Sequence, residues 1–395
     1  MDAPPPPTPH EPTSPERPRR PQPPRPAGTI RIGSIAGSDV LVSASWFLVA
    51  GLIAVVMAPR VEAVQPGLGA GKYLAGVAFA VILYLSILLH EASHAIAARH
   101  YGYRVSSITL HFLGGMTAVE SEARRPREEF VIAVVGPLTS IVVGLAGVGL
   151  WFVTPDGLLL LAVEGLAGAN LLVGVLNLVP GLPLDGGRVL KAGVWQLTGS
   201  RDRGTLAAGW GGRVVAVVLL FGWPLVLREV IGVQPTLLDF VLAGVVAAFL
   251  WMGATSVIRT TRIRQRIPSL VARELARRPV LVPADVSVAE AVRRAQATEA
   301  GGIVTAGPDG RPVGIVNEAA LLKMPEERRP WAAVSTVSRT LTDGMRLPAD
   351  LHGDALVDAL REQPASEYLL VEADGSTYGV LTVRDLDRSI RGVPV

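Results

Sequence analysis

Long apolar blocks separated by short polar segments run from about residue 40 to residue 258, and this pattern predicts helices that cross a membrane. A bilayer core is spanned by about 20 mostly apolar residues, and six of the blocks have about that length. Residues 1–28 are instead rich in Pro and Arg, and residues 265–395 have the mixed charge of a soluble domain. The predicted spans are 41–58, 74–98, 130–152, 158–179, 208–228 and 236–257.

The composition supports a membrane protein with soluble parts. Of the 395 residues, 49% are hydrophobic and only 18% are charged, which is too apolar for an ordinary soluble chain. There is no cysteine, so disulfides are excluded and a metal site must use nitrogen and oxygen ligands. The first 26 residues contain no apolar run, so we expect no cleaved signal peptide. The high content of Ala, Gly, Val and Arg is typical of a GC-rich bacterial genome.

Arginine residues cluster on both sides of the apolar region, and their positions predict the topology. Cytoplasmic flanks of membrane helices are enriched in Lys and Arg, so both ends of the chain are expected in the cytoplasm, with an even number of crossings of the plasma membrane. Binding of nucleic acid to these segments is the alternative, but Arg beside apolar spans favours topology, and we expect no nucleic-acid partner. The flanking residues are Arg17, Arg19, Arg20, Arg25 and Arg31 before the first span, and Arg259, Arg262, Arg264 and Arg266 after the last.

The second span ends in the sequence HEASH at residues 90–94, directly after residues 73–89, which carry no charge. On a helix, His90 and His94 project about 40° from each other, so both imidazoles can face one metal ion. Glu91 is then placed to contact water at that metal without binding the metal itself. This is the arrangement of metalloproteases, in which the carboxylate accepts the proton of the water. The alternative is a chance pattern on a helix surface, which the apolar surroundings disfavour.

A third ligand is needed to complete a catalytic zinc site, and Asp185 in NLLVGVLNLVPGLPLDGGRVL is the candidate. In the predicted topology the second and fourth spans run in the same direction, so their ends meet at the same membrane depth. Pro180, Pro183 and the pair Gly186-Gly187 are expected to break the helix and turn the carboxylate back towards the metal. A solvated turn at Asp185-Gly186 is the simpler alternative.

HEASH together with N177-LVPGLP-LDGG187 resembles the site-2 protease family (peptidase M50) of intramembrane zinc metalloproteases. The resemblance covers most of residues 30–258. It implies that His90, His94 and Asp185 bind one Zn²⁺ and that Glu91 is the general base. It also implies that Asn177 lies beside the active site and holds the substrate or the oxyanion. Asn170 shares a helix face with Asn177, so either residue also fits a simple hydrogen bond between helices.

The segment between the second and third spans predicts a β-hairpin. Residues 105–112 are rich in β-formers and end at Gly114 and Gly115, after which residues 116–119 return as a second strand. A substrate helix must unwind before cleavage, so an exposed strand edge near the zinc would hold it extended, with Gly114 and Gly115 as substrate-binding candidates. A plain cytoplasmic hairpin is the alternative. Gly136-Pro137 in the third span indicates a kink or close packing rather than chemistry.

The C-terminal region contains a repeat with an offset of 65 residues, GGIVTAGPDGRPVGIVNEAALL and SEYLLVEADGSTYGVLTVRDLD. Each copy predicts a strand, an Asp-Gly turn, a strand and a helix, preceded by an amphipathic helix. The pair resembles CBS modules, which often bind adenine nucleotides. The family pattern of Thr or Ser, two residues and Asp is kept as Thr382 and Asp385, whereas the first copy has Asn317 and Ala320. The resemblance implies one site for ATP, ADP or AMP; a structural or dimerising pair, which would form a homodimer, is the alternative.

We therefore expect a polytopic α-helical membrane protein, with about six transmembrane helices, a membrane-associated β-hairpin and a soluble α/β pair of CBS modules. The expected parts are a disordered tail, a metalloprotease domain and two modules, at residues 1–35, 36–260, 265–330 and 331–395. The expected function is cleavage of transmembrane segments in the lipid bilayer, with membrane-anchored anti-sigma or pro-sigma factors as the substrates that the resemblance suggests. Two alternatives are a membrane protein that senses zinc and nucleotide without proteolysis, and a metal transporter.

Overall fold

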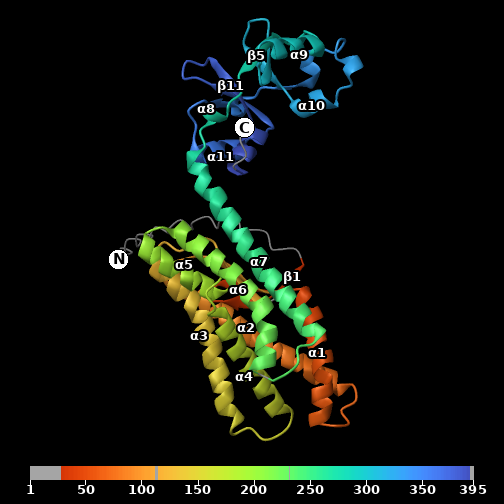
Figure 1. Ribbon diagram of the computed structural model, residues 1–395, viewed down its shortest axis with the longest axis vertical. Coiled ribbons are helices and arrows are strands. Elements are labelled where there is room, and N and C mark those ends of the chain that lie inside the picture. Colours follow the sequence, from red (N-terminus) through yellow and green to blue (C-terminus); the bar gives the residue numbers. More distant parts are fainter. Residues whose placement is uncertain (1–27, 112–113, 231, 392–395) are drawn as a thin grey trace, which may run out of the picture. The chain divides into compact units, whose positions relative to one another are not determined.

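The computed structural model describes residues 28–111, 114–230 and 232–391 (Figure 1). Contacts divide the chain into two units, residues 1–177 and 178–395. The tail expected to be disordered lies mostly outside the described residues. Its last part was predicted wrongly, because Thr29–Ile35 forms strand β1.

Six helices in the described ranges are long and apolar enough to cross a membrane, which confirms the predicted number of spans. The first begins only at Ser45, because residues 38–43 form a strand. The six helices are α1 (Ser45–Val64), α2 (Gly71–His100), α3 (Pro126–Trp151), α4 (Leu158–Asn177), α6 (Arg201–Glu229) and α7 (Leu237–Arg266).

In the first unit, helices α2, α3 and α4 pack against one another, and α1 packs on α2. Beside them lies a four-stranded sheet in the order β1-β2-β3-β4, in which β2 and β3 are parallel and the other pairs are antiparallel. The predicted hairpin is therefore present as β3 and β4, but it extends a hairpin of β1 and β2 that the pattern analysis missed. The strands are β1 (Thr29–Ile35), β2 (Ser38–Ser43), β3 (Val105–His111) and β4 (Gly114–Val119).

Strands β3 and β4 also pack on α2, and the core between them is formed largely by small and β-branched residues. Ile108 and Ala95 are fully buried there. Because side chains alternate along a strand, Gly115 and Thr117 of β4 share one face of the sheet. Met116, on the other face, is 56% exposed. The sheet thus presents alternate residues of β4 to the helix that carries HEASH.

In the second unit, residues 178–184 form an irregular segment that leads into α5 (Asp185–Thr198), after which α6 and α7 pack as a pair. The expected break after the fourth span is present. Gly186 and Gly187 were predicted to extend that break, but they lie in the first turn of α5. They are glycine because a Cβ on Gly187 would lie 2.2 Å from the backbone nitrogen of Leu182, and one on Gly186 would meet the backbone of Leu178 and Val179.

The C-terminal part contains both predicted repeats, each as two strands joined by an Asp-Gly turn and followed by a helix. In each turn the glycine has a positive φ, 76° at Gly310 and 83° at Gly375, which L-residues with a side chain rarely adopt. The first copy comprises α9 (Val288–Ala297), β6 (Gly302–Ala306), β7 (Pro312–Val316) and α10 (Glu318–Lys323), and the second comprises α11 (Gly353–Glu362), β10 (Glu367–Val371), β11 (Thr377–Thr382) and α12 (Val383–Arg391).

The two modules exchange short segments at their boundaries, so the expected division at residue 331 is too early. Strand β8 (Ser338–Thr340) pairs with β7, and β9 (Arg346–Pro348) pairs with β10. Conversely, α8 (Ala272–Leu275) packs in the core of the second module, while β5 (Pro279–Pro283) pairs with β6. Val304 and Ile315 of one sheet pack on Leu369 and Val380 of the other, so the modules share a core.

Candidate metal centre

His90 and His94 lie one turn apart on α2, and each residue is only 4% exposed. Their Nε2 atoms are 3.2 Å apart. The Nδ1 atom of His94 donates to the carbonyl oxygen of Ile132 over 2.6 Å, and Nδ1 of His90 lies 2.9 Å from Oγ of Ser140. A neutral imidazole that carries its proton on Nδ1 has its lone pair on Nε2, so His94 presents a metal-binding lone pair towards His90.

The space in front of the two Nε2 atoms fits a zinc ion. Two ligands about 2.0–2.1 Å from tetrahedral zinc lie about 3.3 Å apart, which agrees with the separation of the two nitrogens. Gly136 of α3 borders this space. A Cβ built on Gly136 would lie 2.2 Å from Nε2 of His94 and 2.7 Å from Nε2 of His90, so a side chain at this position would fill the space in front of the two nitrogens. The prediction of close packing at Gly136 was right, but the packing partner is the candidate metal centre.

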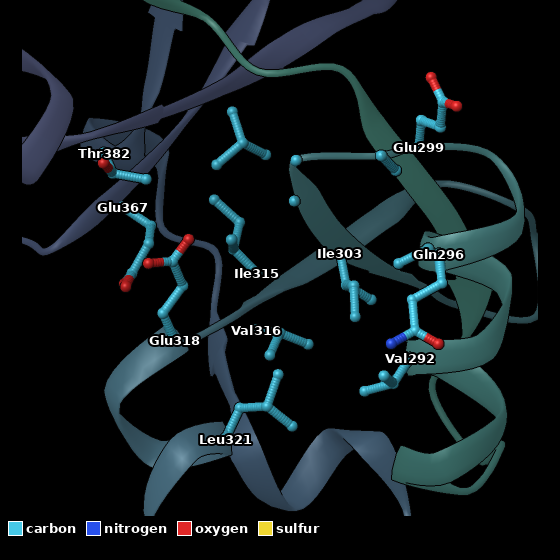
Figure 2. Close-up of a pocket in the computed structure, with 15 residues that line it drawn as sticks. Val292, Gln296, Glu299, Ile303, Ile315, Val316, Glu318, Leu321, Glu367 and Thr382 are labelled. Atoms are coloured by element: carbon cyan, nitrogen blue, oxygen red, sulfur yellow. The ribbon is translucent and has the colours of Figure 1, made fainter. Parts of the chain in front are cut away.

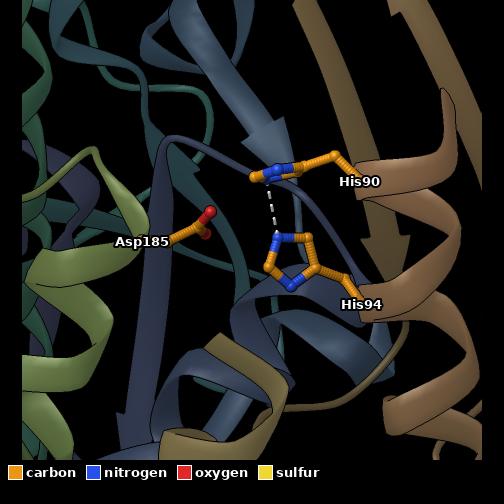
Figure 3. Close-up of side chains that lie close together, drawn as sticks. All are labelled: His90, His94 and Asp185. Carbon is orange, nitrogen blue, oxygen red and sulfur yellow. Dashed lines mark hydrogen bonds between the residues drawn. The ribbon is translucent and has the colours of Figure 1, made fainter. Parts of the chain in front are cut away.

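The third predicted ligand, Asp185, is the first residue of α5, directly after the irregular segment. Each of His90, His94 and Asp185 offers one ligand atom, and these atoms lie within 4.8 Å of one another (Figure 3). Two imidazole nitrogens and one carboxylate are a donor set typical of catalytic zinc, which keeps a fourth position open.

Glu91 is held by strand β4. The hydroxyl of Thr117 donates to Oε2 of Glu91 over 2.7 Å and also contacts the backbone oxygen of Glu91 at 3.1 Å. Gly115 lies so close that a Cβ there would be 2.3 Å from Cγ of Glu91. The predicted hairpin therefore fixes the orientation of the carboxylate next to the two histidines.

Sequence reasoning missed Ser140 and Thr117, although both had a weak signal. Ser140 follows Gly136 by four residues on α3 and so shares its helix face, and Thr117 is two residues from Gly115 on the same strand face.

Asn170 is 3% exposed and donates from Nδ2 to Ser86 of α2, which is the predicted bond between helices. Asn177 ends α4 and is half-buried, and its role stays a prediction. Gly114 begins β4 with a φ of 129°.

In the C-terminal modules, Thr382 and Asp385 are buried together. The Thr382 hydroxyl donates to Oδ2 of Asp385 over 2.8 Å, and Arg277 contacts both carboxylate oxygens, at 2.6 and 2.7 Å. Burial alone raises the pKa of Asp385, but the hydrogen bonds from Arg277 and Thr382 outweigh it and lower the pKa. Arg277 also pairs with Glu318 of the first module. This arginine therefore links the two modules. It also forms an ion pair with Asp385, the carboxylate that was predicted to bind ribose.

A cavity of about 420 Å³ lies next to this ion pair (Figure 2). Its walls are apolar, with Val292, Ile303 and Leu321 among them, and Glu318, Glu367 and Thr382 lie together at one side. Asn317 donates to Glu367 at 3.1 Å, but burial has the larger effect and raises the pKa of that carboxyl. The cavity has room for a small organic molecule.

Comparisons with known proteins agree with this description. Residues 78–160 match the model of peptidase family M50, and residues 272–327 match that of the CBS domain. The chain is 30% identical to Rip3 of Mycobacterium tuberculosis, which carries the name of a zinc metalloprotease, over 91% of this chain and 92% of that protein. It is 28% identical to sll0528 of Synechocystis sp., which carries the same kind of name, over 89% and 93% of the two chains.

A solved structure of a site-2 protease from Methanocaldococcus jannaschii is also similar, with 22% identity, a TM-score of 0.39, and coverage of 58% of this chain and 95% of that one. The motif on a membrane helix and the match over nearly the whole chain define a zinc-dependent membrane peptidase. The chain belongs to peptidase family M50, the site-2 protease family, and carries CBS modules at its C-terminal end. It is a multi-pass membrane protein and a zinc metalloendopeptidase.

Proposed function

We propose that this chain cleaves transmembrane segments of membrane-anchored proteins, with one Zn²⁺ held by His90, His94 and Asp185. The observation that carries the proposal is the pair of buried Nε2 atoms 3.2 Å apart, with Gly136 leaving room in front of them. Zinc, when bound there, polarises a water molecule and the scissile carbonyl group. Members of this family act on membrane proteins within the bilayer, which supports this choice of substrate.

In this proposal Glu91 moves the proton. Its carboxylate accepts a proton from the attacking water and later gives it to the leaving amine. Because Thr117 binds Oε2 over 2.7 Å, the other oxygen, Oε1, is the one left to face the water. Gly115 lies directly against the Glu91 side chain, where a larger residue would displace the carboxylate. The protein therefore supplies an oriented base at a site that largely excludes bulk water.

The substrate is proposed to bind as an extended strand along β4. Within the described ranges β4 is an edge strand of its sheet, and its own residues contact Glu91. Pairing with an edge strand would hold an unwound peptide by its backbone, and glycines at 114 and 115 would allow close approach. Asn177 is proposed to contact the substrate or the oxyanion. Membrane-anchored anti-sigma or pro-sigma factors are the proposed substrates.

The test is cleavage of single-span candidate substrates by the purified protein, with and without a chelator. Glu91→Gln is expected to keep one zinc per chain and to lose cleavage, because an amide cannot accept the proton. His90→Ala/His94→Ala is expected to lose both. If Glu91→Gln cleaves at nearly the wild-type rate, the general-base role is wrong. If the wild type binds zinc and cleaves no membrane peptide, a zinc sensor becomes the better interpretation.

Both termini are proposed to lie in the cytoplasm, because Arg residues flank the first and last spans. Reporter fusions at residues 68 and 270 are then expected on opposite sides of the membrane. The two signals on the same side would contradict the six-span topology.

We also propose that the CBS pair binds an adenine nucleotide at Thr382 and Asp385 and thereby regulates cleavage. Both oxygens of Asp385 accept hydrogen bonds from Arg277 or Thr382, so the nucleotide must displace Arg277. Calorimetry on the full chain is expected to show binding of ATP, ADP or AMP, and Asp385→Ala is expected to weaken it by about 1–3 kcal/mol. No binding at millimolar concentration would leave the modules with a structural or dimerising role.

A further inference from the structure

Arg213 lies in the interior of α6, a helix whose apolar window has a mean hydropathy of 1.8. A charged side chain in a membrane helix is costly and usually has a partner of opposite charge. Within the described ranges, however, Arg213 contacts two indole rings and one hydroxyl group, and none of these is a carboxylate. Among the described residues its positive charge therefore has no anionic partner.

The guanidinium group is held in a defined orientation. Its central carbon lies 4.7 Å from the ring centre of Trp210 on α6 and 5.0 Å from that of Trp251 on α7. Nη2 donates to Oγ1 of Thr255 over 3.1 Å, and Nε lies 3.4 Å from the same oxygen. Because arginine has five N–H donors, several remain for a ligand. Trp210 and Trp251 are 50% and 43% exposed, so this site lies on the surface of the helix pair.

The position of the site along α7 matches the depth of lipid headgroups. Thr255 precedes Arg259 by four residues, which is about 6 Å along a helix, and further arginines follow at 262, 264 and 266. The guanidinium therefore lies about one turn inside the charged end of α7. Tryptophan side chains are enriched at this depth, where acyl chains meet headgroups. Guanidinium groups bind phosphate oxygens with two parallel hydrogen bonds.

We propose that Arg213, Trp210, Trp251 and Thr255 bind the phosphate group of an anionic phospholipid, in the leaflet that faces the Arg-rich end of α7. Basic sites between membrane helices bind lipid headgroups in this way. An anionic lipid is favoured over a zwitterionic one, because the site carries a positive charge and none of the contacts of Arg213 is a carboxylate that would pair with a headgroup amine.

The same two helices hold the segment that leads to Asp185. A Cβ on Gly212 would lie 1.9 Å from the carbonyl oxygen of Leu182, and one on Gly253 would lie 3.0 Å from Cγ of Pro183. A lipid that bridges α6 and α7 therefore stabilises the packing of residues 178–184. Its effect on cleavage rests on the proposed function, but its binding does not.

The test is native mass spectrometry of the full chain, released from nanodiscs with equal amounts of phosphatidylcholine and phosphatidylglycerol. The wild type is expected to retain phosphatidylglycerol, and Arg213→Gln to retain at least tenfold less of it. Arg213→Lys keeps the charge but loses the planar stacking, so its retention should be intermediate. Arg228→Gln is the matched control, because Arg228 is exposed at the other end of α6 and pairs with Glu229; it should behave as the wild type.

Equal retention of both lipids by the wild type would overturn the proposal, as would unchanged retention by Arg213→Gln. Inorganic phosphate is added in a parallel experiment; if it displaces the lipid at millimolar concentration, the site binds free anions and the lipid assignment is wrong. Trp251→Leu removes one stacking face and is expected to reduce retention as well, which keeps the test decisive if Arg213→Gln does not fold. All proteins in this experiment also carry Glu91→Gln, so a failure of proteolysis cannot be mistaken for a failure of lipid binding.

Discussion

Replacing Gly136 by alanine is expected to remove the zinc site while α3 remains helical. The new Cβ would lie 2.2 Å from Nε2 of His94 and 2.7 Å from Nε2 of His90. Van der Waals contact between such atoms is about 3.5 Å, so His94 must move by about 1.3 Å or the methyl group takes the position of the metal. Neither ring is free to move, because Ser140 and Ile132 hold the Nδ1 atoms and both rings are buried.

The expected loss of zinc and of activity follows from how little metal–ligand distances can vary. Metal–ligand distances in proteins vary by only about 0.2 Å, so a shift of about 1 Å breaks the coordination by at least one histidine. Misplacement of about 1 Å at a reacting centre costs about 100-fold in rate, or about 2.7 kcal/mol. We therefore expect zinc content to fall from about one to below about 0.1 per chain after dialysis, and cleavage to fall at least about 100-fold.

The assay is elemental analysis of the purified protein, combined with cleavage of a single-span substrate. Gly149→Ala is the matched control, since Gly149 lies on the same helix and a Cβ there meets no atom within 4 Å. The control is expected to keep zinc and activity, and its helix is expected to be as stable or more stable. A Gly136→Ala protein that keeps one zinc per chain and cleaves normally would refute the placement of the metal between the two histidines.

Three further outcomes are expected. Thr117→Val removes the hydrogen bond to the Glu91 carboxylate, so kcat should fall about 10- to 100-fold with KM unchanged. Thr117→Ser keeps the hydroxyl group and should have normal kcat. A normal kcat in the valine variant would contradict the positioning role of Thr117. Ser140→Ala removes the partner of Nδ1 on His90 and should weaken zinc affinity by about 10- to 100-fold in a competition titration; unchanged affinity would mean that Ser140 does not orient the ring. Arg277→Ala leaves Asp385 buried without its ion-pair partner and should lower the free energy of unfolding of the CBS pair by about 3 kcal/mol. Because the folded pKa of Asp385 lies below its unfolded value of about 3.9, this ion pair stabilises fully above that pH and less as the pH falls through the folded pKa. Denaturant titrations of the full chain between pH 3 and 7 should show this dependence, and Asp385→Asn should lack it.

The candidate site was predictable where the spacing of residues along one helix fixes the geometry. His90 and His94 are four residues apart, so a helix of 3.6 residues per turn places both rings on one side whatever surrounds it. The six apolar blocks and the repeat of 65 residues are likewise local or periodic signals, and the structure contains the corresponding helices and both modules. The strands β1 and β2 also had a signal, the alternation in TIRIGSI and DVLVS, but it was hidden beside the Pro-rich tail.

Contacts between elements distant in sequence were decided only by the tertiary structure. Thr117 contacts Glu91 across 26 residues, Ser140 contacts His90 across 50, and Arg277 contacts Asp385 across 108. No pattern of hydrophobicity specifies such a partner, because periodicity determines which face of a helix or strand is buried and leaves open which residue covers it. The sequence by itself therefore determined the motif, the membrane spans and the class of enzyme. The packing of α3 and β4 on α2 explains why residue 136 is a glycine and determines which side chain orients the Glu91 carboxylate.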